Sequence, residues 1–213
     1  MSKIFKYRVG FLGCPSKPDV RWTERNVLKL KKLGFNTLQL NIAWGSRPGD
    51  EPLNLEDVVD MSEIKEFIQK LPLRSSREVK KIKTRKENLM ARIKLCKNLG
   101  MRSIFHFGAP YNMHCRFGDN PPNCLNDPVI QNFYSALLIA FDRQFPGVDD
   151  LLLYTYDQDA WLCNEFGTCP KCVGIPLHYR VSKFVNSIAN TWKKINPNGK
   201  LWWEPWELSA GQV

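Results

Sequence analysis

Aromatic rings and carboxyl groups gather near the end of the chain, in the run Leu201-Trp202-Trp203-Glu204-Pro205-Trp206-Glu207. Three tryptophans and two glutamates stand in these seven residues. Indole faces stack on the C–H faces of sugar rings, and carboxyl groups bond sugar hydroxyls or move protons at a glycosidic oxygen. We therefore expect Trp203, Trp206, Glu204 and Glu207 to contact a carbohydrate. The alternative is a tryptophan-rich edge of the core.

A second run, Tyr154-Thr155-Tyr156-Asp157-Gln158-Asp159-Ala160-Trp161, ends an apolar segment in polar and aromatic residues. In an extended conformation Asp157 and Asp159 share one face. Two carboxyl groups so close repel each other, so one of them can keep its proton at neutral pH and act as a general acid. Glu165 is a further candidate for this role, and Trp161 offers another ring for sugar stacking. The alternative for both aspartates is a capping role at a strand end.

Three cysteines form a separate pattern, with Cys163 shortly before the pair Cys169 and Cys172. The Cys-x-x-Cys spacing lets two thiolates bind one zinc ion from a tight turn. Cys163 would be a third ligand of this structural zinc site, and the fourth would come from Cys115, Cys124, His114 or His178. Buried or free thiols and a redox-active dithiol are the alternatives.

Short apolar segments alternate with longer amphipathic ones, and Gly34 and Gly100 stand where helices are expected to end. The pattern predicts strands at 7–12, 37–43, 102–107, 151–156 and 201–204. It predicts helices at 22–33, 55–71, 78–99, 128–145 and 178–195, with Asp127 and Pro128 beginning the fourth. This order of strands and helices requires parallel strands joined by right-handed crossovers.

The residues that could take part in catalysis or binding follow the predicted strands, which is where (β/α)8 barrels place their sites. Asn41, Trp44, His106 and Tyr111 would line the same mouth as the carboxyl groups. The alternatives are a hydrogen-bonded core histidine for His106 and plain loop residues for the others. No Gly-x-Gly-x-x-Gly follows the first strand, which disfavours a dinucleotide-binding sheet. We predict an α/β fold with five parallel βα units, a partial (β/α)8 TIM barrel. Residues 1–213 would form one domain, the N-terminal part of a full barrel.

Composition narrows the class of protein. Much of the net charge of +10 lies between Arg74 and Lys97, but no aromatic residue lies there to stack bases, so we expect a solvated helix face. A basic face that binds nucleic acid is the less favoured alternative. No apolar run is long enough to span a membrane. Seven cysteines without a secretion signal favour reduced thiols and a cytoplasmic location.

Several segments resemble a known family. Leu30 to Trp44 is similar to the first-helix and second-strand segment of barrel glycoside hydrolases, and Arg92 to Phe107 is similar to the helix and third strand that follow. Tyr154 to Cys172 and Leu201 to Val213 resemble bacterial proteins of glycoside-hydrolase type, distantly similar to hexosaminidase and α-glucuronidase barrels. The His-x-Gly-x-Asp-Glu signature of hexosaminidases is absent.

The resemblance implies hydrolysis of a glycosidic bond, with no cofactor required. Asp159 would be the general acid, with Glu165 as its competitor, and Glu204 would be the second carboxylate or a ligand for a hydroxyl. Trp161, Trp203 and Trp206 would form the sugar platform, with Trp44 at its rim. The alternative is a carbohydrate-binding protein without catalysis, an incomplete barrel that a partner or a missing C-terminal segment completes.

Overall fold

The computed structural model describes residues 5–13, 21–41, 49–64, 76–110, 124–155 and 165–205. These residues form a five-stranded sheet whose order in space, β1-β2-β3-β4-β5, is the order along the chain, and every neighbouring pair is parallel. The strands are β1 (Val9–Phe11), β2 (Thr37–Gln39), β3 (Arg102–Gly108), β4 (Asp150–Thr155) and β5 (Leu201–Pro205). All five strands predicted from the sequence are present.

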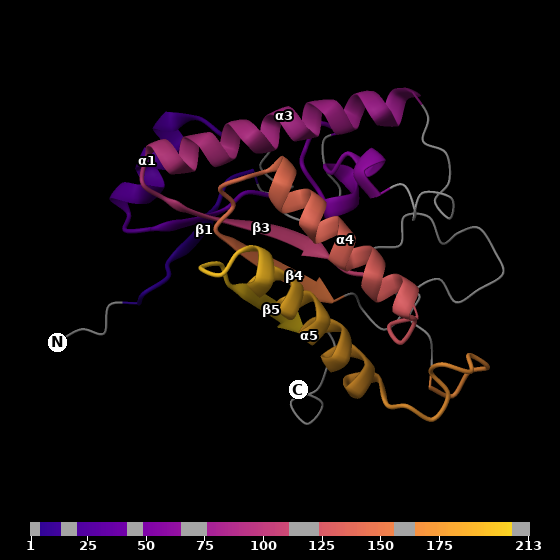
Figure 1. Cartoon of the computed structure of the whole chain (residues 1–213). Helices are drawn as coiled ribbons and strands as arrows, with labels where there is room; N and C mark the ends of the chain where they lie inside the picture. The colour runs from indigo at the N-terminus through magenta and orange to yellow at the C-terminus, as the bar shows by residue number, and fades with distance from the viewer. Residues whose placement is uncertain are drawn as a thin grey trace.

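The helices are α1 (Glu24–Lys32), α3 (Ser76–Asn98), α4 (Pro128–Gln144) and α5 (Leu177–Ile195). Figure 1 shows α3, α4 and α5 covering the same side of the sheet. Local signals explain their ends: Asp127 accepts a hydrogen bond from Val129 N at the start of α4, and Gly34 and Gly100 adopt positive φ of 91° and 63° after α1 and α3.

One predicted helix is wrong over its described part. Residues 55–64 form two short 3₁₀ turns, η1 (Leu55–Asp57) and η2 (Met61–Ile64), where the apolar pattern predicted a helix over 55–71. The side chain of Asp60 accepts a hydrogen bond from Ser62 N, so a local side-chain acceptor replaces the helical backbone partner. Residues 65–71 lie outside the described residues.

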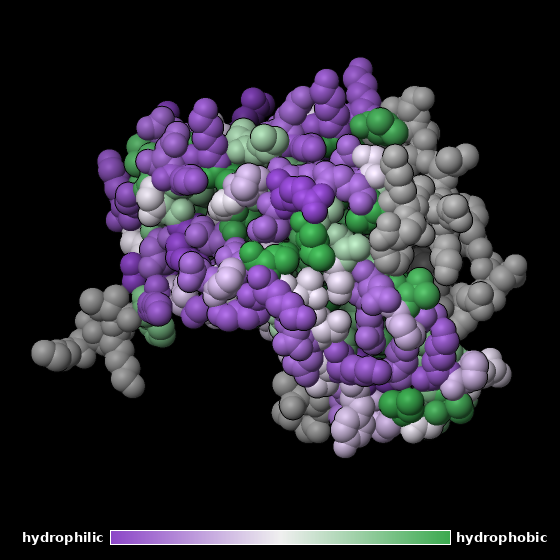
Figure 2. Space-filling model, in the orientation of Figure 1, coloured by the Kyte–Doolittle hydropathy of each residue, from purple (hydrophilic) through white to green (hydrophobic). Residues whose placement is uncertain are grey.

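The two faces of the sheet have different surroundings. Phe105 and Phe107 of β3 and Leu151 and Leu153 of β4 belong to the main core beneath the helices, where Phe105 packs on Phe141 of α4. Alternate residues of these strands, such as His106, point to the other side of the sheet, which we call the inner face. Figure 2 shows the helix-covered side, where hydrophilic side chains predominate and apolar ones form small separate patches.

Sequential parallel strands with helices on one side form a curved, barrel-type sheet and not a doubly wound one, which needs a reversal of strand order. The curvature is visible in a contact across the inner face. Tyr7, just before β1, and Trp202 of β5 have ring centroids 5.0 Å apart, although β1 and β5 are the outermost strands of the described sheet. In a closed ring of eight strands the first and fifth stand opposite each other. The chain therefore forms an α/β fold that resembles part of a (β/α)8 barrel.

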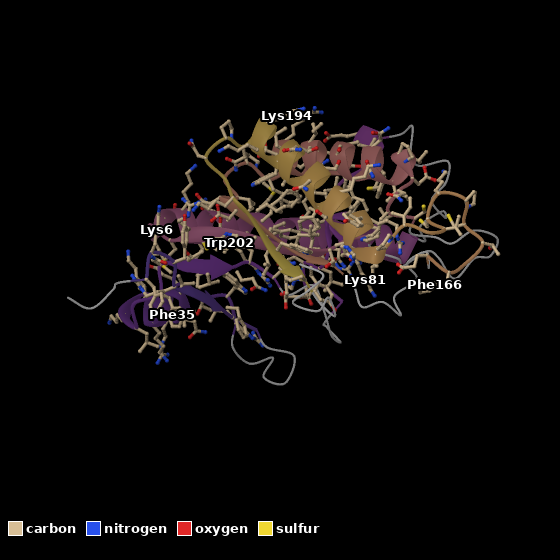
Figure 3. The ribbon with its side chains drawn as sticks, turned by 90° about the horizontal axis from the view of Figure 1, so that it is seen from below. Lys6, Phe35, Lys81, Phe166, Lys194 and Trp202 are labelled. Atoms are coloured by element: carbon tan, nitrogen blue, oxygen red, sulfur yellow. The ribbon has the colours of Figure 1, made fainter. Side chains whose placement is uncertain are left out.

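Charged side chains and aromatic rings fill the amino end of this inner face. Arg102 Nη2 donates to the buried Asp150 at 2.8 Å, and Lys200 Nζ lies 4.8 Å from the centre of the Tyr7 ring. Figure 3 shows Lys6 and Trp202 at this end of the molecule and Phe166 at the other. In barrels of this kind the amino end of the strands serves stability, and the carboxyl end carries the site.

Candidate functional site

Two predicted residues come together at the carboxyl end of the inner face. His106 of β3 and Glu204 of β5 approach with 3.7 Å between Nε2 and Oε2. The register explains the meeting, because His106 aligns with Leu152 and Trp202, and Glu204 lies one inward-facing step further along β5. The His106 side chain is 1% exposed, whereas that of Glu204 is 39% exposed. Glu204 therefore presents its carboxyl group to solvent beside a buried imidazole.

Gln39 of β2 determines which imidazole nitrogen faces Glu204. Its Nε2 lies 3.0 Å from His106 Nδ1 and also donates to Asn41 O at 2.8 Å. Only the NH₂ group of the amide can donate to a carbonyl oxygen, so the same group also donates to Nδ1. In the neutral ring the proton then sits on Nε2, directed toward Glu204.

The side chain of Asn41 forms two hydrogen bonds with the backbone of His106. Its Nδ2 donates to His106 O at 2.7 Å, and its Oδ1 accepts from His106 N at 2.8 Å. The β2 ladder ends near here, with Leu40 N donating to Ile104 O at 2.8 Å. The side-chain amide of Asn41 thus continues the pairing of β3 where backbone pairing stops; Asn41 is 1% exposed, and its contact with a ligand stays a prediction.

Burial raises the pKa of the Glu204 carboxyl above its ordinary value. A carboxyl group with a raised pKa keeps its proton to a higher pH than an ordinary one, and an adjacent N–H donor can fix the same oxygen. The 3.7 Å between Nε2 and Oε2 is longer than a hydrogen bond, and Nε2 is buried, so of these two groups only the Glu204 carboxyl group is open to a ligand. The Glu204 carboxyl group could therefore bind a hydroxyl group or transfer a proton, with His106 behind it.

Glu165 lies elsewhere, at the start of the described segment before α5. Its Oε2 accepts from Arg180 Nη2 at 3.1 Å, and the Arg180 side chain is 1% exposed. Arg180 Nε donates to Ile175 O at 2.8 Å, so the guanidinium ties both ends of this loop to α5. The contact gives Glu165 a structural role, and its role as a competing general acid stays a prediction.

The two tryptophans of β5 point to opposite faces. Trp203 packs against the main core, and its Nε1 donates to Thr155 Oγ1 at 3.2 Å. Trp202 lies on the inner face with Glu204, against Tyr7. Sequence reasoning chose Trp203 for sugar stacking, missed the inward-facing place of Trp202, and missed Gln39 at the site. Strand alternation from Glu204 was the available signal for Trp202, because residues two apart share a face.

The other predicted site residues lie outside the described residues, and their roles stay predictions. They are Trp44, Tyr111, Asp157, Asp159, Trp161, Cys163, Trp206 and Glu207.

Three thiols meet between two connections at the carboxyl side of the sheet. Cys124 Sγ lies 3.2 Å from Cys172 Sγ and 3.9 Å from Cys169 Sγ. All three Sγ atoms lie within 4.8 Å of one another, so they could bind a metal ion. Burial and the neighbouring Cys172 thiol raise the pKa of Cys124 to about 11. Cys124, one of four residues considered for the fourth ligand, thus joins Cys169 and Cys172.

Comparisons with known proteins add a distant structural resemblance. No family model matches the sequence, and no curated protein matches it. A GH5-4 broad specificity endoglucanase from an uncultured bovine rumen ciliate aligns with a TM-score of 0.42 and 16% identity, over 87% of this chain and 41% of that one. A GH5 lichenase from Caldicellulosiruptor sp. F32 aligns with a TM-score of 0.38 and 14% identity, over 86% and 43%.

A GH138 enzyme targeting pectin rhamnogalacturonan II aligns with a TM-score of 0.37 and 14% identity, over 85% of this chain and 22% of that one. The chain spans less than half the length of each of these glycoside hydrolases. The barrel-type architecture rests on the strand order and register described above. Within the described residues, no helix is long and apolar enough to cross a membrane.

Proposed function

We propose that the carboxyl end of the inner face binds a carbohydrate and that the complete site hydrolyses a glycosidic bond. The observation that carries this proposal is the approach of Glu204 Oε2 to within 3.7 Å of His106 Nε2. Glu204 is exposed enough to meet a ligand, and burial raises its pKa. His106 is held by Gln39 and Asn41 so that an N–H faces the carboxyl group.

Hydrolysis needs one carboxyl group to protonate the leaving oxygen and a second to activate water or attack the sugar. Glu204 is the second carboxylate of this pair in our proposal. Asp159 is the other, with Asp157 and Glu165 as competitors. His106 would support Glu204 from the buried side, and it takes no proton in this scheme.

We assign the remaining sugar contacts to residues at the same end of the strands. Trp161 and Trp206 would stack on sugar rings, with Trp44 at the rim and Trp203 supporting β5 from the core side. Tyr111 and Glu207 would bond hydroxyls. The proposed reaction uses carboxyl groups and requires no cofactor, so a zinc ion at the three thiols would have a structural role.

The test compares oligosaccharide binding by the protein and by two charge-neutral variants. Isothermal titration with cellotetraose and with a pectic oligosaccharide should show binding of at least one. Glu204→Gln removes a carboxylate acceptor and should weaken binding by about tenfold or more, as hydrogen bonds to charged groups contribute ~1.5–3 kcal/mol. Glu87→Gln, an exposed position on α3, is the matched control and should bind normally. Equal affinity of the Glu204 variant and the wild type would contradict the proposal.

The second candidate function is carbohydrate binding without catalysis, in a barrel that a partner or a further C-terminal segment completes. The exposed inner face of β1 favours it. A Cβ at Gly10 would meet Phe35 and Leu30 beneath the helices, so Val9 and Phe11 point inward, and they are 42% and 53% exposed. Product analysis separates the two candidates, because a binding protein retains the titrated affinity and releases no shorter sugars.

A further inference from the structure

The cluster of Cys124, Cys169 and Cys172 joins two connections that are distant in sequence. Cys124 lies just before α4, in the connection from β3, and the other two lie in the connection from β4 to α5. Cys124 and Cys172 are buried, and Cys169 is half-buried. Both connections lie on the carboxyl side of the strands, the side that carries His106 and Glu204.

A tight backbone turn brings the thiols of Cys169 and Cys172 close to each other. Cys172 N and Val173 N both donate to Cys169 O, at 3.0 and 2.9 Å, which closes a tight turn with Pro170 inside it. Proline fixes φ near the value that the second residue of such a turn needs. The turn directs both thiols to the side where Cys124 stands.

The cluster does not resemble cysteines that fill a hydrophobic core. Among the described residues, its apolar packing consists of the three cysteines alone, separate from the main core. Cys96 of α3 provides the contrast, because it is buried within the main core among aliphatic and aromatic side chains. A buried group made only of polarizable, deprotonatable sulfur atoms points to a metal ion.

The spacing of the sulfur atoms fits one metal ion, and the softness of sulfur excludes hard cations. Four thiolates at 2.3 Å from a tetrahedral zinc stand about 3.8 Å apart. The observed Sγ separations of 3.2 and 3.9 Å from Cys124 bracket this value. Hard cations such as calcium and magnesium take oxygen ligands and do not suit this set.

We propose that Cys124, Cys169 and Cys172 bind one zinc ion that fastens the β3–α4 connection to the β4–α5 connection. Each thiol releases its proton to solvent on binding, no electron is transferred, and a fourth ligand or water completes the tetrahedron. This inference does not depend on the proposed carbohydrate site.

Polar contacts next to the thiols join the same two connections that the proposed zinc ion would join. Lys171 Nζ pairs with Asp127 at 2.6 Å, and Asn126 Nδ2 donates to Lys171 O at 2.9 Å. Gly174 N donates to Glu165 O at 2.9 Å and closes the loop on itself. The zinc ion would therefore hold a preformed loop against the start of α4, and through Glu165 would connect it to α5.

Metal analysis of protein purified under reducing conditions without chelator tests the site directly. We expect about one zinc per chain, and X-ray absorption at the zinc edge should show at least three sulfur neighbours near 2.3 Å. Cys124→Ala and Cys172→Ala should each lower zinc affinity more than about tenfold, while the control Cys96→Ala should retain it. The X-ray measurement needs no variant, so it tests the site even where a variant fails to fold.

Several results would overturn the inference: no zinc after reconstitution with excess Zn²⁺ and reductant, fewer than three sulfur neighbours, or full zinc affinity in Cys124→Ala. Hydrogen exchange tests the fastening. Chelation should accelerate exchange in residues 124–127 and 165–175 together, and leave β2 and β3 unchanged. Acceleration confined to 165–175 would show that the metal does not join the two connections.

Discussion

Replacing Asn41 by alanine tests whether one side chain holds the candidate site in place. The change removes the partners of His106 N and His106 O, both buried, as well as a hydrogen bond to Leu53 O. A buried backbone group left without its partner costs about 1–3 kcal/mol. Two such groups give ~2–6 kcal/mol, and we expect a loss near 4 kcal/mol in the free energy of unfolding for Asn41→Ala.

Urea denaturation followed by tryptophan fluorescence measures this loss. In thermal unfolding, at roughly 2–4 °C per kcal/mol for a domain of this size, the melting temperature should fall by about 8–16 °C. Asn26→Ala is the matched control, since Asn26 Nδ2 donates to Arg21 O at the exposed end of α1. It should cost less than about 1 kcal/mol. A loss below 1 kcal/mol in Asn41→Ala would refute the idea that this amide replaces the backbone ladder.

Three further changes address other parts of the structure. Arg180→Met should lower the free energy of unfolding by about 2 kcal/mol, which denaturant unfolding measures. The loss is smaller than for a fully buried pair because Glu165 is partly exposed, and an unchanged midpoint would argue against the ion pair. Gly199→Ala should cost about 1–3 kcal/mol, because the added Cβ would lie 2.7 Å from Asp149 O; a wild-type melting temperature would disprove the close approach. The raised pKa of Glu204 means that the folded protein binds this proton more tightly than the unfolded chain. Stability should therefore fall as pH rises from the ordinary carboxyl pKa through the folded pKa, and Glu204→Gln should lack this fall in a pH series of unfolding curves.

The sequence predicted the strands, most helices and their ends, because periodicity and glycine positions depend on local physics. It predicted the Cys169 and Cys172 pair because the Cys-x-x-Cys spacing is also a local feature. It could not choose Cys124 over the other candidates for a further ligand, because that meeting depends on the β3–α4 and β4–α5 connections lying side by side. The choice of Trp203 over Trp202 shows the same limit. Strand alternation puts Trp202 and Glu204 on one face and Trp203 on the other, but the position of the helices decides which face is the inner one.

Side-chain amides, and not backbone, complete β3 at the site. The pairing of β2 ends at Gln39, while β3 continues to Gly108, so the last part of β3 needs other partners on that side. Asn41 supplies them for His106, and Asn54 Oδ1 accepts from Gly108 N at 2.6 Å.

A backbone ladder tolerates a change of side chain, whereas a bond made by an amide is lost with that residue. Substitutions among these amides should therefore lower both stability and carbohydrate affinity. At the amino end, where Arg102, Lys200 and Tyr7 fill the inner face, substitutions should lower stability alone. Measuring both quantities for Asn54→Ala and Tyr7→Ala would show whether the two ends of the sheet divide these tasks. Equal loss of affinity in both variants would mean that they do not.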